Sequence, residues 1–189
     1  MDVCQAIAKR RSIRKFHNRT IPPAVLERIV DLARYYPTPA NLQPLRFIVT
    51  TNAGHCACVF SCLKWGGYLE RYRIEPQNRP TAYILVLADP KLAASSAFSA
   101  GAAATELMLA AQAQGIASCC LTPARTGPIE AAFSLDPNRL KLLCVIALGY
   151  GAQESQVVDQ EDTPRYRLDD SGNLVVPKLR TEEIVSWDV

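Results

Sequence analysis

An alanine-rich segment at residues 96–114 is the feature that most constrains the fold of this chain. Leu107, Met108 and Ala111 recur there at helical spacing, and Gly115 follows at a position where helices commonly end. Alanine has the highest helix propensity of all residues, and its side chain is small. The segment therefore predicts a long central helix that packs closely against its neighbours.

Strand and helix patterns alternate around this segment. Apolar runs predict strands at residues 47–51, 82–88, 117–121 and 142–148. Helical patterns occur at residues 22–36, 55–64 and 128–133. No GxGxxG motif follows a strand, which argues against a dinucleotide-binding Rossmann half and a Walker phosphate loop. With 189 residues, 49% of them hydrophobic, the chain can close one sizeable core, so we expect residues 1–189 to form a single domain.

A basic run, Arg10-Arg11-Ser12-Ile13-Arg14-Lys15, follows a short helical pattern that Asp2 can cap. Guanidinium groups and a hydroxyl at one place can make strong charge-assisted hydrogen bonds to phosphate oxygens, and arginine suits such planar recognition better than lysine. The run therefore indicates an anion site. A solvated basic turn and a nucleic-acid arm are the alternatives.

The charge balance limits the possible partners. Lys+Arg of 21 against Asp+Glu of 18 gives a net charge of only +3, so the chain lacks the general basic field of nucleic-acid binders. The N-terminus reaches basic residues too early for a secretory signal, and no apolar stretch of about 18 residues occurs. We expect a soluble cytoplasmic protein with no nucleic-acid or membrane partner.

The seven cysteines form neither an even disulfide framework nor paired CxxC zinc units, which favours a reducing compartment. Cys56, Cys58 and Cys62 with His55 could be read as metal ligands, but their spacing matches no common structural zinc pattern. Free cysteine is an ordinary small buried residue, so we expect packing and no metal.

A proline-rich loop at residues 37–44 carries Asn41 and Gln43 on a stiff backbone. Preorganised amides lose little freedom on binding and can read the edge of a ring, although they can equally satisfy the backbone of the turn. Residues 65–80 are expected to form another loop or lid. The sequence leaves open whether Trp65, Tyr68 and Tyr72 cover a ligand or pack inward.

From Ala152 onward, polar residues predominate, and the pattern of core-forming residues is sparse. We expect this extension, residues 152–189, to wrap over the body or over a partner subunit. Lys178 and Arg180 lie on it. In an extended segment two such residues face the same way, so both could address one anion.

Several of these motifs together resemble the FMN-dependent nitroreductase family, and the resemblance covers nearly the whole chain. The residues that carry it are Arg10–Arg14, Pro37–Pro44, the alanine-rich helix with Gly115, Val145–Tyr150 and Pro177–Arg180. It implies an α+β fold with a central, mostly antiparallel sheet flanked by helices. It further implies an intertwined homodimer in which both chains build each FMN site at the subunit interface.

The resemblance also assigns roles to residues around the cofactor. It implies that Arg10, Ser12, Lys178 and Arg180 surround the FMN phosphate, that Arg14 lies beside the pyrimidine edge, and that Leu121 and Thr122 lie near flavin N5. Thr38, Asn41 and Gln43 would come from the other subunit. Arg11 and Pro37 belong to the same motifs and complete the expected cofactor-binding set, which contains no catalytic side chain and no metal ligand.

The chain departs from the family pattern at several positions. Thr122 stands where glycine is often found, and Pro123 after it has no N–H to donate. Leu45 stands where a tryptophan often follows the Gln-Pro pair, and the alignment of Arg180 relative to Lys178 depends on whether one residue is inserted there.

The implied activity is that of an oxidoreductase working by a ping-pong mechanism. NADH or NADPH would reduce the flavin, and the flavin would reduce a nitroaromatic or quinone-like acceptor, so the cofactor carries the reaction. A fixed cation at the pyrimidine edge would stabilise the charge of the reduced ring. The alternative is an FMN-binding protein of the same fold used for flavin storage or sensing.

Overall fold

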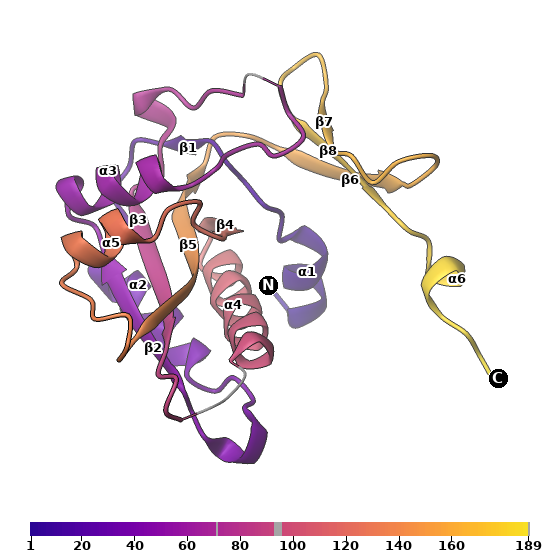
Figure 1. Ribbon diagram of the computed structural model, residues 1–189. Coiled ribbons are helices and arrows are strands. Elements are labelled where there is room, and N and C mark those ends of the chain that lie inside the picture. Colours follow the sequence, from indigo (N-terminus) through magenta and orange to yellow (C-terminus); the bar gives the residue numbers. More distant parts are fainter. Residues whose placement is uncertain (71, 93–95, 189) are drawn as a thin grey trace.

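The computed structural model describes residues 1–70, 72–92 and 96–188, and it shows a sheet covered by helices on both faces (Figure 1). The helices are α1 (Val3–Lys9), α2 (Pro23–Ala33), α3 (Ala53–Cys62), α4 (Ala97–Ala113), α5 (Gly127–Ala132) and α6 (Thr181–Ile184). The strands are β1 (Phe16–His17), β2 (Leu45–Thr50), β3 (Ala82–Ala88), β4 (Ala117–Leu121), β5 (Lys141–Gly151), β6 (Ser155–Asp159), β7 (Arg167–Leu168) and β8 (Leu174–Lys178). The expected α+β fold is confirmed.

The central sheet is antiparallel throughout and is built on β5. This strand pairs with β1, β3 and β4, and β3 in turn pairs with β2. Every residue of β3 is buried, as its continuous apolar pattern predicts for a strand covered on both faces. A shift in register between Val86 and Leu87 interrupts the pairing of β3 with β5.

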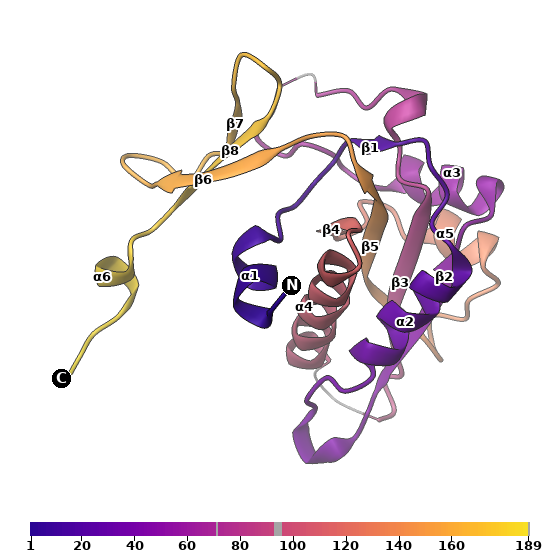
Figure 2. The ribbon, with the colours of Figure 1, turned by 180° about the vertical axis from the view of Figure 1, so that it is seen from behind.

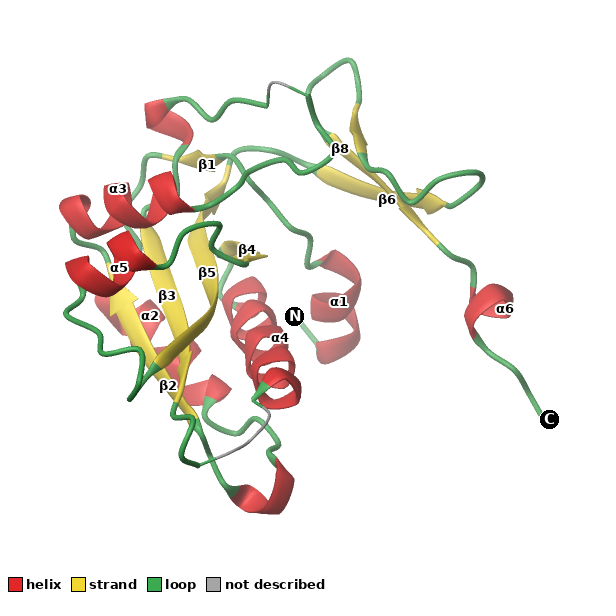
Figure 3. Ribbon diagram, viewed as in Figure 1, coloured by secondary structure: helices red, strands yellow, loops and turns green. Residues whose placement is uncertain are grey.

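Alternate side chains of β3 enter two separate cores. Ile84 and Val86 pack with α2 and α4 on one face, while Tyr83 and Leu85 pack with α3 and α5 on the other. Figure 3 shows these two helical layers with the sheet between them. The alternation follows from the two-residue period of a strand.

The alanine-rich segment forms α4, as its composition predicts. Ala103, Leu107 and Ala111 are fully buried, and the helix packs against α1, α2, β4 and β5. Gly115 has a φ of +72° just beyond the helix, a left-handed conformation that glycine adopts without strain. No helix among the described residues is long and apolar enough to span a membrane.

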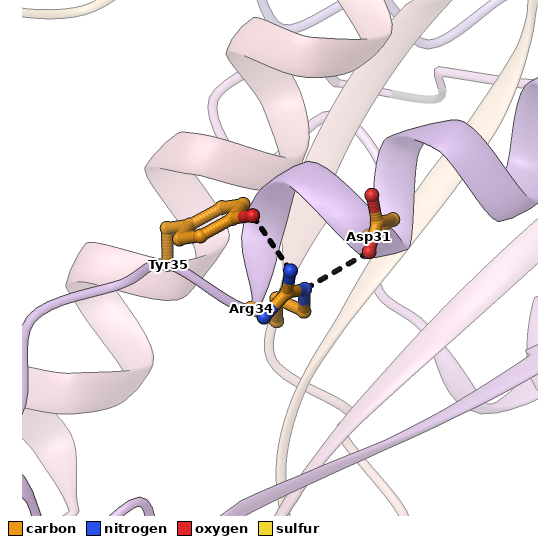
Figure 4. A network of polar contacts seen from close by, with 3 residues as sticks. All are labelled: Asp31, Arg34 and Tyr35. Atoms are coloured by element: carbon orange, nitrogen blue, oxygen red, sulfur yellow. Dashed lines mark hydrogen bonds and ion pairs between the residues drawn. The ribbon is translucent and has the colours of Figure 1, made fainter.

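A network of polar contacts on the surface lies at the C-terminal end of α2, just before the proline-rich loop (Figure 4). Arg34 Nε donates to Asp31 Oδ1 at 2.9 Å, and Arg34 Nη2 donates to the Tyr35 hydroxyl at 2.6 Å. The Arg34 guanidinium also lies 4.2 Å from the centroid of the Tyr35 ring. These contacts lie on the surface where the chain leaves α2 before Pro37.

The extension after residue 152 forms a small sheet of its own, which its sparse apolar pattern does not predict. Strand β8 pairs in parallel with β6 and antiparallel with β7. Leu174 and Val175 are buried there and supply the apolar contacts that the rest of the extension lacks. Figures 1 and 2 show this sheet beside the body and α6 projecting away from it. The proposed wrapping over a partner stays a prediction.

Candidate functional site

The basic run lies along β4. Helix α1 ends at Lys9 with Arg10 as its C-cap, and Ser12 then forms a parallel bridge with Ser118 of β4. The Ile13 N–H donates to the Ser118 carbonyl at 3.0 Å, which anchors the backbone of the run. The sequence folds this way because Asp2 caps α1, accepting a hydrogen bond from the Gln5 N–H at 2.8 Å, so the helix delivers the run directly to the strand.

Arg10, Ser12 and Arg14 gather at the middle of β4. Burial raises the pKa of the Cys119 thiol to about 11, while the charge of Arg14, a hydrogen bond with Ser12 and the charge of Arg10 act in the opposite direction. All three groups therefore lie close enough to influence one thiol. The pKa of the neighbouring Cys120 is lowered mainly by its contact with Cys144, against the effect of burial, with a smaller contribution from Arg10.

The Arg11 side chain points back toward α1. Its Nη2 donates to the carbonyls of Ile7 and Ala8 in the last turn of α1. Burial, and then the nearby charge of Arg10, lower its pKa. In this conformation Arg11 caps the helix C-terminus, and its place in a cofactor site stays a prediction.

Arg14 carries an unused donor. Its Nη1 donates to the Ser12 carbonyl at 3.1 Å, and its guanidinium lies 4.7 Å from the centroid of the Tyr166 ring. Arg14 Nε, however, is buried without a hydrogen-bond partner among the described residues. A buried N–H without an acceptor is costly, so Arg14 is suited to a ligand that supplies one.

Tyr166 was missed by sequence reasoning, because it lies in the polar extension and shares no motif with the basic run. Its ring packs edge-on against Tyr68 at 5.1 Å between centroids. The neighbouring Tyr72 is half-buried, and its hydroxyl donates to Gln153 Oε1 at 3.3 Å. Gln153 Nε2 in turn donates to the Gly172 carbonyl at 2.9 Å. These contacts tie residues 65–80 to the extension.

The structure places Leu121 and Thr122 at the end of β4. Leu121 pairs with Val145 of β5, and Pro123 forms an isolated bridge with Leu63. Thr122 is exposed between these two pairings. Its backbone is held on both sides, which suits a contact with a ligand that lies along β4.

The proline-rich loop lies elsewhere. In Figure 1 it joins α2 to β2 at the bottom of the molecule, well away from the segment between α1 and β1. Ala40, Asn41 and Gln43 have φ angles of 49°, 54° and 47°, which are strained for residues other than glycine. Pro37 and Thr38 begin this loop, and Thr38 Oγ1 accepts a hydrogen bond from Ser99 Oγ of α4 at 3.3 Å. Such strain commonly concentrates at functional sites.

Lys178 and Arg180 are also apart from the basic run within one chain. Lys178 ends β8, and Arg180 precedes α6 on the projecting extension (Figure 2). Arg180 Nε lies 3.5 Å from carboxylate oxygens of both Glu182 and Glu183. A single chain thus brings together Arg10, Ser12 and Arg14, but neither the loop nor the tail residues expected to join them.

The cysteines make no disulfide and no metal cluster in the described part of the chain. The His55 ring packs against Phe133 with 4.3 Å between centroids and 40° between planes, Cys58 Sγ contacts the Pro128 carbonyl, and Cys62 is buried. These side chains pack between α3 and α5.

The chain is similar to known proteins over most of its length. The model of the family described as "Nitroreductase family" matches residues 7–74 and 57–150. A relative from Methanothermobacter thermautotrophicus, assigned as an NADH dehydrogenase/NAD(P)H nitroreductase, is 28% identical over 176 residues, which covers 89% of this chain and 87% of that protein. A relative from Archaeoglobus fulgidus with the same assignment is 29% identical over 170 residues, which covers 86% of this chain and 93% of that protein.

Solved structures share the fold. A protein from Desulfovibrio desulfuricans, assigned as a nitroreductase and crystallised with FMN, is 26% identical and superposes with a TM-score of 0.71 over 86% of this chain and 93% of its own. A nitroreductase family protein from Clostridium difficile 630 is 22% identical, with a TM-score of 0.71 over 100% of this chain and 99% of its own. Since the family match extends from residue 7 to residue 150, the chain belongs to the nitroreductase family.

Proposed function

We propose that this chain is an FMN-dependent oxidoreductase that uses NADH or NADPH to reduce nitroaromatic or quinone-like acceptors in a ping-pong reaction. Family membership supports the reaction class, and the similar protein crystallised with FMN supports the cofactor. The seven cysteines, which form no disulfide among the described residues, suit the reducing cytoplasm that we propose as its location.

The observation that carries this proposal is the orphaned donor of Arg14. Its buried Nε lacks a hydrogen-bond acceptor among the described residues, although its guanidinium is fixed by Ser12 and Tyr166. The carbonyl-bearing pyrimidine edge of a flavin supplies such an acceptor. A fixed cation beside that edge stabilises negative charge as the ring becomes reduced.

The residues along β4 suit the rest of the cofactor. Arg10 and the Ser12 hydroxyl would hold a phosphate, and the exposed backbone at Thr122 would face the ring. When bound, FMN supplies the two-electron chemistry that links a nicotinamide donor to the acceptor. The chain then needs only to orient both substrates and stabilise charge, so we assign no catalytic side chain.

We further propose a homodimer that completes this site. The proline-rich loop and the cations Lys178 and Arg180 lie away from the basic run within one chain, so a second copy would supply them. Val3, Ile7 and Phe98 support this arrangement, because these apolar side chains on α1 and α4 are more than half exposed, at 67%, 56% and 67%.

The test starts from the visible spectrum of the purified protein. We expect the absorption bands of bound oxidised FMN, their bleaching when NADPH or NADH is added without oxygen, and steady turnover when menadione or nitrofurazone follows. Arg14→Gln should weaken FMN binding and lower the midpoint potential of the bound flavin. A protein that cannot be loaded with FMN would overturn the proposal, and bleaching without turnover of any acceptor would favour flavin storage or sensing.

A further inference from the structure

A second candidate site lies near the end of β4, between the end of α3 and residues 72–79. This pocket, called here the 65–80 pocket, has a volume of about 490 Å³. Its lining combines aromatic and basic side chains, namely Phe60, Trp65, Tyr72, Lys64, Arg73 and Arg79. A volume of this size falls within the range of small-molecule sites, about 300–1,000 Å³.

The aromatic part of the pocket is a fixed platform. The rings of Phe60 and Trp65 are stacked, with 5.3 Å between centroids and 27° between planes. Trp65 Nε1 donates to the Phe60 carbonyl at 3.4 Å, which restrains the indole ring. Trp65 is only partly buried, so it can stack with a planar heterocycle.

The pocket is also positively charged. Lys64, Arg73 and Arg79 face a single lining carboxylate, that of Glu75, and none of the three forms an ion pair with another described residue. Lys64 and Arg73 are exposed. Unpaired cations grouped around a cavity favour an anionic ligand.

Arg79 is the best-defined of these cations. Its guanidinium lies 4.3 Å from the centroid of the Phe60 ring. Its Nε is buried without a hydrogen-bond partner among the described residues, as is Arg14 Nε in the neighbouring site. A partly desolvated guanidinium with an unused donor gains most from an oxyanion.

Leu63 connects the two sites. It lines the 65–80 pocket and forms the isolated bridge with Pro123, which follows Thr122 at the end of β4. The pocket therefore adjoins the end of the candidate site where Thr122 lies. A dinucleotide with its nicotinamide beside the flavin would extend its other half in this direction.

We propose that the 65–80 pocket binds the adenosine 2′-phosphate half of NADPH, so that this enzyme prefers NADPH to NADH. This inference rests on the proposed function, because it assigns the second half of the same electron donor. Adenine stacks on Trp65, and Lys64, Arg73 and Arg79 bind the 2′-phosphate. NADH has a hydroxyl at that position and cannot use these charges.

Ligands without a nicotinamide test the pocket independently of turnover. With FMN-loaded protein, calorimetry should show that 2′,5′-ADP binds at least tenfold more tightly than 5′-AMP, and that 2′,5′-ADP competes with NADPH. Inorganic phosphate at the same concentration should not compete, because it lacks the ring that stacks on Trp65. The factor of ten corresponds to about 1.4 kcal/mol, close to the lower end of the range for one hydrogen bond to a charged group.

Substitutions test whether the cations of the 65–80 pocket cause the preference for NADPH. Lys64→Gln and Arg73→Gln should each lower kcat/KM for NADPH about tenfold while changing kcat/KM for NADH less than twofold. Arg28→Gln is the matched control. It removes the same charge, but Arg28 is exposed on α2, on the other side of the sheet. Both pocket residues are exposed, so we expect the variants to fold and to retain FMN.

The outcomes separate this inference from the proposed function. Equal affinity for 2′,5′-ADP and 5′-AMP, or an unchanged NADPH-to-NADH ratio in both pocket variants, would overturn the pocket assignment even if the flavin is reduced normally. Selective binding of 2′,5′-ADP that the variants abolish would sustain it, even in a protein that fails to oxidise NADPH. Competition by inorganic phosphate alone would instead identify a simple anion site and count against adenosine recognition.

Discussion

Gly149 of β5 packs directly against Phe16, the first residue after the basic run. A Cβ added at Gly149 would lie 2.7 Å from Phe16 Cδ1 and 3.0 Å from Phe16 Cβ and Cγ. Phe16 is fully buried and pairs with Gly151, so its ring cannot move without displacing β1. Overpacking of this kind costs about 1–3 kcal/mol. We therefore expect Gly149→Ala to lower the free energy of unfolding by about that amount.

Urea denaturation of the FMN-free protein, at one fixed protein concentration, measures this effect. The midpoint should fall while the dependence on urea stays constant, because the folded chain buries nearly the same surface. Gly127→Ala is the control, since a Cβ at Gly127 meets no atom within 4 Å. Its free energy of unfolding should stay within about 0.5 kcal/mol of the parent value.

A double-mutant cycle identifies Phe16 as the cause. Phe16→Leu shortens the side chain that the new Cβ would meet, so the loss caused by Gly149→Ala should shrink by at least about 0.5 kcal/mol in that background. An unchanged loss in the Phe16→Leu background, or a Gly149→Ala protein as stable as the parent, would refute the reasoning. Displacing Phe16 should also weaken FMN binding, since Arg14 precedes it by two residues.

Three further outcomes can be measured. Leu107→Ala should cost about 2–5 kcal/mol in urea denaturation, because Leu107 is fully buried in α4, and a smaller loss would contradict its place in the core. Asp2→Ala should cost about 1 kcal/mol, because it removes the cap on the Gln5 N–H, whereas Asp2→Asn should retain most of the stability. Alkylation of Cys119 by iodoacetamide should be slow at pH 8 and accelerate toward pH 11, because burial raises its pKa to about 11 and the thiolate is the reactive form. Peptide mass spectrometry would check the last result, and rapid labelling of Cys119 at pH 8 in the folded protein would contradict it.

Local patterns were sufficient for most of the central body. The bounds predicted for β3 and β4 agree with the structure, and α4 differs from its prediction by one residue at each end. These elements have long apolar or alanine-rich runs with clear breaks. Strand β1 has only two residues, and its pairing with Gly151 depends on contacts distant in sequence, so no local pattern indicates it.

The composition of the extension does not predict its small sheet. Its apolar residues are few, yet Leu174 and Val175 are buried once β8 lies between β6 and β7. Parallel pairing of β6 with β8 requires a long connection that sequence periodicity does not reveal.

The candidate site also combines residues that are neighbours in sequence with residues that meet only in the folded chain. The grouping of Arg10, Ser12 and Arg14 beside β4 could be anticipated because these residues are neighbours in sequence, although their binding of FMN stays a prediction. Tyr166 lies about 150 residues later and reaches Arg14 only through the folded extension. The roles of Asn41, Gln43, Lys178 and Arg180 depend on a second copy and likewise stay predictions.

The hydrogen bonds from Tyr72 to Gln153 and from Gln153 to Gly172 make the 65–80 pocket sensitive to loss of the C-terminal tail. One wall of the 65–80 pocket is held by the tail rather than by the central sheet. Proteolytic trimming before Gly172 would therefore loosen this wall and remove Lys178 and Arg180, while leaving the central sheet in place. Recombinant versions that differ only in their C-terminal length should then be compared as different enzymes.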